Sequence, residues 1–364
     1  MKLYIVVLFA ATLIVAACNQ SVGASTQSAT SMSVTATVSP VANVPSATPS
    51  VVSPTAAREI SLEAGQWTYI FYHDGLEKVV LVNGGPEQGK PADDPLELWS
   101  WDGKQWSLIV ADVNGPTWRN WPAVAYDTAH NVLVIHGGLQ GRRSFDETCE
   151  WDGQAWTQHT VPGPEAREGA LMAYDESRGQ MLLFGGSTPD MEIHADTWAW
   201  NGEVWQRVSE SGPAARFPGG MVYDAARQEI LLYSGHFAAA SGEFVNYDDL
   251  WAWDGSSWRE IATDGPTPGH RTHAGFVYDP VEKEVLLIGS GSDTFLRDVW
   301  AWDGTIWEDV PTSNTPARSG NNVAYDPARD RFVLFGGVER PGGKALDDTW
   351  EWDRTQWSCI SNCQ

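Results

Sequence analysis

The chain has 364 residues and carries 47 Asp and Glu side chains against 23 Lys and Arg, for a formal net charge of −24. So acidic a chain argues against nucleic acid and anionic membrane surfaces as partners, because binding to phosphate depends on Lys and Arg. The length allows two average domains or one large all-β domain. Twenty tryptophans are an unusually large number, and their positions are periodic.

The first residues predict export. Residues 1–17 contain one early Lys and an apolar run too short for a spanning helix, as in a secretory signal peptide. Residues 15–18, Val-Ala-Ala-Cys, resemble a bacterial lipobox, which implies that Cys18 is lipidated and becomes the mature N-terminus. An ordinary cleaved signal with an incidental Cys18 is the alternative. We therefore expect a lipoprotein on the outer side of the cytoplasmic membrane or at the cell surface, with the choice between inner and outer membrane left open.

The next segment predicts a tether. Residues 19–57 contain no charged side chain and are mostly Ser, Thr, Val, Ala and Pro. Such a composition lacks the large apolar side chains that bury a core. Residues 18–57 are therefore expected to be a disordered tether, and residues 58–364 to be a globular monomer that meets the membrane only through its lipid anchor.

Two further cysteines are close in sequence. Cys359 and Cys363 lie in the segment SCISNCQ, and exported proteins meet oxidising conditions. A terminal disulfide is favoured over a metal pair, because no further ligand accompanies them. Cys149 is left over.

One tryptophan-rich phrase recurs about every fifty residues, which is the signature of a repeat fold. Its second tryptophan falls at Trp101, Trp151, Trp200, Trp253, Trp302 and Trp352. A second anchor, usually Tyr-Asp, ends at Asp74, Asp127, Asp175, Asp224, Asp279 and Asp326. Ten residues after each aspartate comes Gly84, Gly137, Gly185, Ser234, Gly289 or Gly336. This constant interval predicts two strands joined by a turn of fixed length.

Each unit is expected to form four short strands, the third of them Trp-x-Trp and the fourth beginning at the last Trp. Alternation along a strand places both rings of Trp-x-Trp on one face. The following Asp-Gly or Asn-Gly indicates a tight hairpin turn, which as a two-residue turn would set Trp99 opposite Trp106. Asp353-Arg354 replaces it in the sixth unit. Because Arg resists a positive φ, a longer or different turn is expected there.

Six four-stranded units predict an all-β, six-bladed β-propeller with four antiparallel strands per blade. The pattern R…YD…LLFGG…DTWxWDGxxW over residues 58–364 resembles the kelch-repeat family, including the propeller of galactose oxidase-like proteins. Seventeen of the twenty tryptophans occupy repeat positions, so we expect them to pack between blades. Cys149 replaces a first tryptophan and is expected to be a buried, inert thiol. Closure of the ring is left open, with residues 58–64 as a possible addition to the last blade.

Charged residues follow the same period. Eight residues before each Tyr-Asp aspartate, five units have an arginine, and the first unit has Gln66. These are Arg119, Arg167, Arg216, Arg271 and Arg318. Two residues before the first Trp, or before Cys149, lies an acid in every unit: Glu97, Glu147, Asp196, Asp249, Asp298 and Asp348. The kelch resemblance implies that the arginines lie near the mouth of the central pocket, where they bind acidic peptides in one adaptor. The favoured interpretation is that each is held by a carboxylate and fixes its loop.

Departures from the repeat are the better candidates for function. Trp118 and Trp121 lie off the repeat beside Arg119, and His270 and His273 flank Arg271. Together with the arginines they form the predicted ligand-binding set. Exposed tryptophan near Arg and acids suits stacking against a sugar or a peptide side chain, whereas capping of the inter-blade core is an equal alternative for the two tryptophans.

No enzyme signature emerges. The copper site of galactose oxidase-like enzymes needs two His, two Tyr and a crosslinked Cys, and no such constellation is present. His270 and His273 alone do not make a metal site, so no metal or cofactor is expected. A glycosidase needs a pair of carboxylates, for which the off-repeat acids Glu168, Glu192 and Glu243 are the first candidates.

The leading hypothesis is therefore a non-enzymatic module that binds a glycan or an envelope or extracellular protein through its loop-rich rim. The alternatives are a carbohydrate-active enzyme (oxidase, lyase or hydrolase) with an axial site, and a scaffold of an envelope complex. Fold does not decide among them.

Overall fold

A computed structural model of the chain describes residue 62 and residues 68–84, 90–188, 190, 192–216, 219–238, 244–290, 295–320, 322–339 and 343–363. Residues 1–57 and 58–364 are separate units. The signal peptide, Cys18 and the tether predicted in the first unit lie outside the described residues. In the part of the chain described, no helix is long and apolar enough to cross a membrane.

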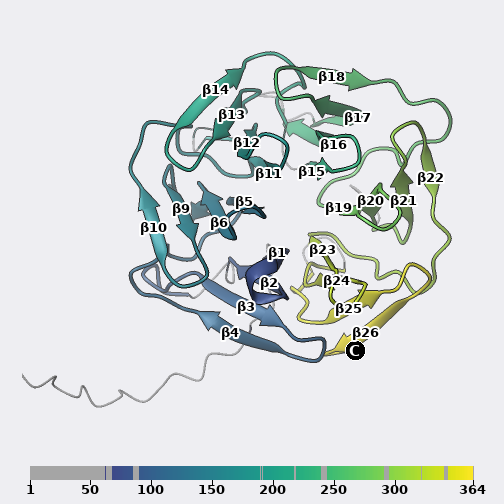
Figure 1. Cartoon of the computed structure of the whole chain (residues 1–364), viewed down its shortest axis with the longest axis horizontal. Helices are drawn as coiled ribbons and strands as arrows, with labels where there is room; N and C mark the ends of the chain where they lie inside the picture. The colour runs from purple at the N-terminus through teal and green to yellow at the C-terminus, as the bar shows by residue number, and fades with distance from the viewer. Residues whose placement is uncertain are drawn as a thin grey trace, which may run out of the picture. The chain divides into compact units, whose positions relative to one another are not determined.

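Residues 58–364 form a β-propeller of six blades around a central axis (Figure 1). Each blade is an antiparallel four-stranded sheet, which confirms the predicted fold class. Blade 1 is β1–β4, blade 2 is β5, β6, β9 and β10, and blades 3 to 6 take β11–β14, β15–β18, β19–β22 and β23–β26.

The first strand of every blade lies innermost and lines the axis (Figure 1). These inner strands are β1 (Thr68–His73), β5 (Ala123–Asp127), β11 (Leu171–Asp175), β15 (Gly220–Asp224), β19 (Gly275–Asp279) and β23 (Asn322–Asp326). The second strands are β2 (Lys78–Asn83), β6 (Val132–His136), β12 (Gln180–Phe184), β16 (Glu229–Ala238), β20 (Glu284–Ile288) and β24 (Arg331–Phe335). A short 3₁₀ turn, η1 (Asp74–Leu76), joins β1 to β2.

The tryptophan phrase forms the two outer strands. The third strands are β3 (Glu97–Trp101), β9 (Thr148–Trp151), β13 (Thr197–Trp200), β17 (Phe244–Trp253), β21 (Val299–Trp302) and β25 (Thr349–Trp352). The fourth strands are β4 (Trp106–Val110), β10 (Trp156–His159), β14 (Trp205–Ser209), β18 (Trp258–Ile261), β22 (Trp307–Asp309) and β26 (Trp357–Ser361). A small hairpin of β7 (Leu139–Gln140) and β8 (Arg143–Ser144) lies in the loop between β6 and β9.

The predicted register of the outer hairpin was wrong. Trp101, not Trp99, lies opposite Trp106, and Trp99 lies opposite Leu108. The connection has four residues, because Asp102 accepts hydrogen bonds from the backbone N–H groups of Lys104 and Gln105 through Oδ1, at 2.8 Å each. An aspartate that caps its own turn in this way replaces the two-residue turn that Asp-Gly alone suggested.

The sixth hairpin has the same length as the others, so the expectation of a different turn was also wrong. Trp352 pairs with Trp357, and Arg354 adopts a φ of 72° at the position where the other five blades have glycine. Its guanidinium forms ion pairs with Asp279 of blade 5, at 2.7 Å, and with Asp330, at 2.5 Å. These pairs compensate for the positive φ, which disfavours a side chain.

At three of the other hairpins, those of Gly103, Gly255 and Gly304, an arginine of the preceding blade lies over the turn glycine. A Cβ built on Gly255 would come within 1.7 Å of Arg178 Nε, and one on Gly304 within 1.8 Å of Arg227 Nε. Blade 5 has Glu282 at the position equivalent to Arg178 and Arg227, three residues after the Tyr-Asp aspartate. Arg354 therefore supplies from blade 6 the guanidinium that blade 5 lacks.

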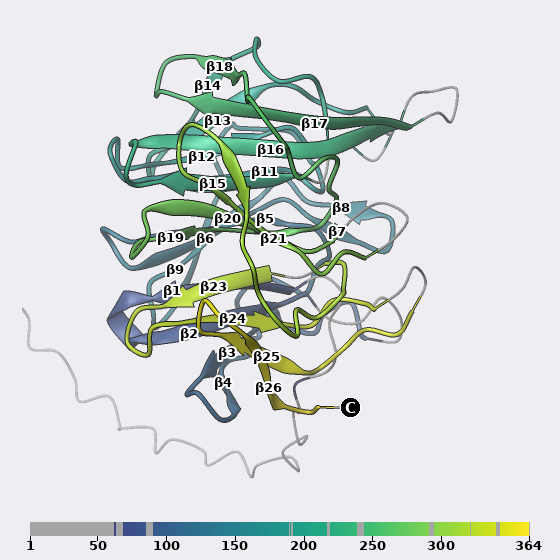
Figure 2. The ribbon, with the colours of Figure 1, turned by 90° about the vertical axis from the view of Figure 1, so that its right-hand side faces the viewer.

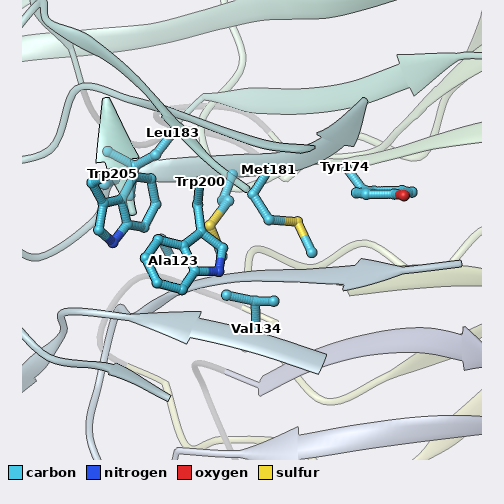
Figure 3. Packing of buried hydrophobic residues seen from close by; sticks show 9 residues of the cluster. Ala123, Val134, Tyr174, Met181, Leu183, Trp200 and Trp205 are labelled. Carbon is cyan, nitrogen blue, oxygen red and sulfur yellow. The ribbon is translucent and has the colours of Figure 1, made fainter. Parts of the chain in front are cut away.

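The tryptophans pack between blades, as predicted. The second tryptophans are almost fully buried, with 0–2% of their surface exposed. Figure 3 shows one such cluster, in which Trp200, Trp205, Met181 and Leu183 of blade 3 pack against Ala123 and Val134 of blade 2, with Tyr174 at its other end. At roughly 25 cal/mol per Å² and 150–250 Å² per aromatic side chain, each buried ring contributes about 4–6 kcal/mol before entropy is counted.

Hydrogen bonds between neighbouring blades follow one residue position. The last tryptophan of a blade donates its indole N–H to the threonine before Trp-x-Trp in the preceding blade: Trp205 to Thr148, Trp258 to Thr197 and Trp106 to Thr349, at 2.8–2.9 Å. Where that residue is Leu98, Leu250 or Val299, the indole N–H of Trp156, Trp307 or Trp357 has no partner among the described residues.

The ring closes without exchange of strands, because blade 1 and blade 6 each contain four consecutive strands. Trp101 donates to Glu351 and Trp106 to Thr349 across this junction. Leu62 packs against the hydrophobic cluster between the two blades, whereas residues 58–61 and 63–64, the rest of the proposed addition to blade 6, lie outside the described residues. A disulfide joins Cys359 and Cys363 at the end of β26.

Candidate functional site

The inner strands begin at one face of the ring, here called the entry face, where each Arg of the register lies. The loops between second and third strands emerge at this face as well, and the ten-residue strands β16 and β17 extend beyond it (Figure 2). At the opposite, turn face the inner strands end and turn into the second strands. The predicted ligand-binding residues therefore all belong to the entry face.

The arginines of the register are buried and paired with the predicted acids. Arg167 donates to both oxygens of Asp196, at 2.8 and 3.2 Å, and to the backbone oxygens of Glu165 and Gly185. The other pairs are Arg119 with Glu147, Arg216 with Asp249, Arg271 with Asp298 and Arg318 with Asp348. The five arginines are 0–5% exposed. Each arginine joins its entry loop to the acid before the third strand of its own blade. This agrees with the favoured interpretation and leaves them little surface for a ligand.

In blade 1, Lys90 replaces the arginine as the partner of the acid, which the sequence pattern did not predict. Its Nζ lies 2.9 Å from Glu97 Oε1, and Trp99 donates its indole N–H to the other oxygen of Glu97. The equivalent acids in blades 3 to 6 likewise accept an indole N–H from the tryptophan two residues later. Lys90 comes from a loop of variable length, so its position carried no periodic signal.

The charge of these acids is set by opposing effects. Burial alone would raise the pKa of Asp196, but the hydrogen bonds and charge of Arg167, with the indole of Trp198, outweigh it and lower the pKa. The pKa values of Asp249 and Asp348 are lowered in the same way. These three acids are therefore ionised at neutral pH, each in an ion pair with the arginine of its own blade.

Trp118 is not the exposed stacking surface that was expected. Its side chain is 6% exposed, and its indole N–H donates to the backbone oxygen of Pro91 at 2.6 Å. Its ring is therefore buried rather than exposed. Trp121 is different, because it remains half-buried.

The residue two positions after each of these arginines is here called the entry position, and its backbone conformation is unusual. Trp121, Gly169, His273 and Gly320 occupy it in blades 2, 3, 5 and 6, with φ of 52°, 66°, 53° and 74°. Neighbouring entry positions touch, since Gly169 donates its backbone N–H to Trp121 O at 2.8 Å and Gly320 to His273 O at 3.1 Å. These four residues lie just before the inner strands of their blades, and we call this part of the entry face the axial mouth.

Glycine suits a positive φ, whereas bulky side chains there are rare and cost roughly 1 kcal/mol or more. Blades 3 and 6 show that glycine satisfies the geometry of the mouth. Trp121 and His273 therefore occupy strained positions that the repeat does not require to be aromatic.

Two polar side chains next to the mouth have unpartnered oxygens. Asn120 Oδ1 and Glu168 Oε2 are buried and have no hydrogen-bond partner among the described residues. Asn120 precedes Trp121 and Glu168 precedes Gly169, and both backbones pair with the loop after the second strand. Burial raises the pKa of the Glu168 carboxyl. A buried acceptor without a partner is costly in a folded protein and is often completed by a ligand or water.

Histidines gather on the blade 4 and blade 5 side of the mouth. Burial lowers the pKa of His236, and the charge of His270 lowers it further. Burial, together with His236, lowers the pKa of His273 to about 3. These rings are therefore neutral near pH 7. Among the described residues, no group of three or more His, Cys, Asp or Glu side chains is arranged to hold a metal ion.

The remaining candidates lie apart from the mouth or outside the structure. Glu192 is exposed in the loop between β12 and β13, and Glu243 lies outside the described residues. Cys149 is buried in β9, and burial raises its pKa to about 12, so the group is a thiol at neutral pH.

No family model and no curated protein matches the chain. A solved structure entitled "Structure of YjhT" is similar, with a TM-score of 0.60 over 82% of this chain and 97% of the other, at 12% sequence identity. The match shows the propeller fold alone. Any function must therefore be argued from the residues of this chain.

Proposed function

We propose that this chain is an envelope lipoprotein whose kelch-type propeller binds a neutral glycan at the axial mouth, as a non-enzymatic monomer. The observation that carries the proposal is the pair of aromatic residues, Trp121 and His273, at positive φ where blades 3 and 6 have glycine. Backbone strain of this kind persists where the surrounding structure holds it, and it clusters at binding and active sites. The kelch assignment is supported by the sequence pattern in six copies.

The chemistry of the mouth fits a sugar. A half-buried indole offers an apolar surface on which a pyranose ring can stack. Asn120 Oδ1 and Glu168 Oε2 are acceptors without partners, and sugar hydroxyls are donors that would satisfy them. The net charge of −24 and the closed arginine pairs disfavour an anionic glycan.

A carbohydrate-active enzyme at the same mouth is the second candidate. The raised pKa of Glu168 favours it, because a general acid near neutral pH needs such a shift. A glycosidase would need a second carboxylate about 5–10 Å away, and the acids of the register are engaged in ion pairs.

The test is a binding screen of neutral oligosaccharides and polysaccharides with the full chain in neutral detergent, with product analysis of each ligand. Trp121→Ala should reduce binding at least tenfold without unfolding the protein. Trp156→Ala, a half-buried tryptophan of the repeat at the start of β10, is the matched control and should retain binding. Hydrolysis or elimination that Glu168→Gln abolishes would favour the enzyme. Silence across the panel would exclude the glycan and favour a protein partner.

The anchor is tested separately. Metabolic labelling with a radioactive fatty acid should label the wild-type chain and not Cys18→Ser, and the label should fractionate with membranes. Labelling that survives the substitution would contradict lipidation of Cys18.

A further inference from the structure

A cavity lies at the opposite, turn face of the propeller. It has a volume of about 450 Å³ and is lined by residues of all six inner strands, near the points where they end. Volumes of this size are typical of small-molecule sites. The Arg register and the axial mouth contribute no residue to its lining, so the cavity is distinct from the proposed glycan site.

The lining is aromatic and apolar. Six tyrosines take part, and Met172, Met221 and Phe276 add apolar side chains: the tyrosines are Tyr72, Tyr126, Tyr174, Tyr223, Tyr278 and Tyr325. Five of them belong to the Tyr-Asp pairs of the repeat. The Tyr-Asp pairs, which served above only to identify the repeat, therefore bring phenol rings together around the axis.

The hydroxyl groups of three of these tyrosines are already engaged outside the cavity. Tyr126 donates to Asn131 Oδ1 at 2.9 Å, Tyr325 donates to Asp330 Oδ1 at 2.9 Å, and Tyr223 shares a hydrogen bond with Ser177 Oγ. Their rings, rather than their hydroxyls, are therefore what these tyrosines contribute. For these three tyrosines, recognition relies on apolar contact and on the electrons of the rings.

The charged residues that line the cavity are all acidic. Asp74 and Glu176, both exposed, are the charged residues among the described lining, and none of the lining residues is Lys, Arg or His. Four arginines of the turn face are held in ion pairs: Arg178, Arg227, Arg329 and Arg354. Lys283 is flanked in the sequence by two acids, Glu282 and Glu284. An anion would meet no free positive group in this lining.

We propose that the turn-face cavity binds a small organic cation, with its apolar body among the inner strands and its positive charge near the tyrosine rings and the carboxylates of Asp74 and Glu176. Cations are attracted to the faces of aromatic rings, and quaternary ammonium groups are recognised by such cages. The apolar depth of the cavity selects against small, strongly hydrated cations such as free metal ions.

The test compares three probes with one aromatic body: benzyltrimethylammonium, benzyl alcohol and benzoate. Each is titrated by calorimetry and by ligand-observed NMR into the full chain in neutral detergent. The cation should bind with a Kd of about 1 mM or tighter, as expected for a ligand of this size. The alcohol should bind at least tenfold more weakly and benzoate not at all. Equal binding of the three probes, or no binding of the cation at about 10 mM, would overturn the proposal.

Two variants assign the site. Tyr278→Leu should weaken cation binding about 3- to 30-fold, in line with the range of cation–π interactions. Glu176→Gln should weaken it about threefold, as for an exposed ion pair. The difference from the wild type should shrink at high salt, which screens exposed charges, and binding of the neutral alcohol should not change. Glu260→Gln, an exposed carboxylate on the outer strand β18, is the control and should bind like the wild type. If Glu176→Gln and Glu260→Gln behave alike, the carboxylate plays no part and the proposal fails.

Discussion

The outer hairpin turn and the axial mouth both require a positive φ, and the chain departs from glycine at each for a different reason. In the hairpin, the exception is Arg354, whose guanidinium binds Asp279 and Asp330. At the mouth, the exceptions are Trp121 and His273, whereas Gly169 and Gly320 serve blades 3 and 6.

The difference separates structure from function. Arg354 replaces a contact between blades that the neighbours obtain from Arg178 or Arg227, so the exception at the hairpin is explained by the fold. Trp121 and His273 replace glycine at the axial mouth, where glycine makes the backbone hydrogen bonds equally well. The backbone geometry of the repeat does not call for an aromatic residue at these two positions, which makes them the candidates for binding.

The largest effect on stability is expected from replacing Arg354, the non-glycine residue at the hairpin turn. Arg354→Gly leaves the nearly buried Asp279 without its ion pair, and removing one partner of such a pair costs about 3 kcal/mol even after the strain at positive φ is relieved. Glu282→Arg added to it places an arginine where blades 3 and 4 have theirs and should restore most of the loss. Guanidinium unfolding checks both; equal stability of the single and double variants would contradict the account.

A histidine in the core, His136, should make the stability of the fold depend on pH. His136 lies in β6 where blades 3 and 6 have Phe184 and Phe335, and burial, with Arg167 and Arg119, lowers its pKa to about 3. The ring is neutral in the fold and charges in the unfolded chain below about pH 6.5, so its contribution is complete above that pH and is lost as the pH falls toward 3.

Between pH 7 and pH 5 this histidine alone should lower the free energy of unfolding by about 2 kcal/mol. His136→Phe should reduce the pH dependence by that amount, as measured by denaturant unfolding at the two pH values. An unchanged difference between pH 7 and pH 5 would show that His136 is not held neutral.

A smaller effect should follow from the threonines between blades. Thr197→Val removes the acceptor of the Trp258 indole N–H and makes this junction like that of Leu250 with Trp307. The expected loss is about 1 kcal/mol, since a buried donor is left without a partner. The reverse change, Val299→Thr, offers an acceptor to Trp357 and should leave stability unchanged or slightly higher. A loss of stability in both variants would argue that shape at this position matters more than the hydrogen bond.

Most of the fold could be predicted from the sequence because the same pattern recurs in six repeats. The period, the constant interval between Tyr-Asp and glycine, and Trp-x-Trp gave six blades of four strands and the burial of the tryptophans. The hairpin register was wrong because Asp-Gly also begins a four-residue turn when the aspartate caps it, as Asp102 does.

The site was less accessible to sequence analysis. The arginines and acids could be paired by period, but the burial of Trp118 depends on a contact with Pro91, 27 residues away. Positive φ at Trp121 and His273 was hidden, although alignment of the units would have set both against Gly169 and Gly320. The turn-face cavity arises only when six inner strands meet around one axis, so no single unit predicts it.

The most direct test of the central claim compares the free energies of unfolding of Trp121→Gly and Trp121→Ala. Both remove the ring, but only glycine relieves the positive φ. The account predicts that Trp121→Gly is more stable by about 1 kcal/mol and that both variants lose glycan binding. At an ordinary backbone position alanine is the more stable of the two. An alanine variant at least as stable as the glycine variant would show that Trp121 is not strained, and the main support for a binding site at the axial mouth would be lost.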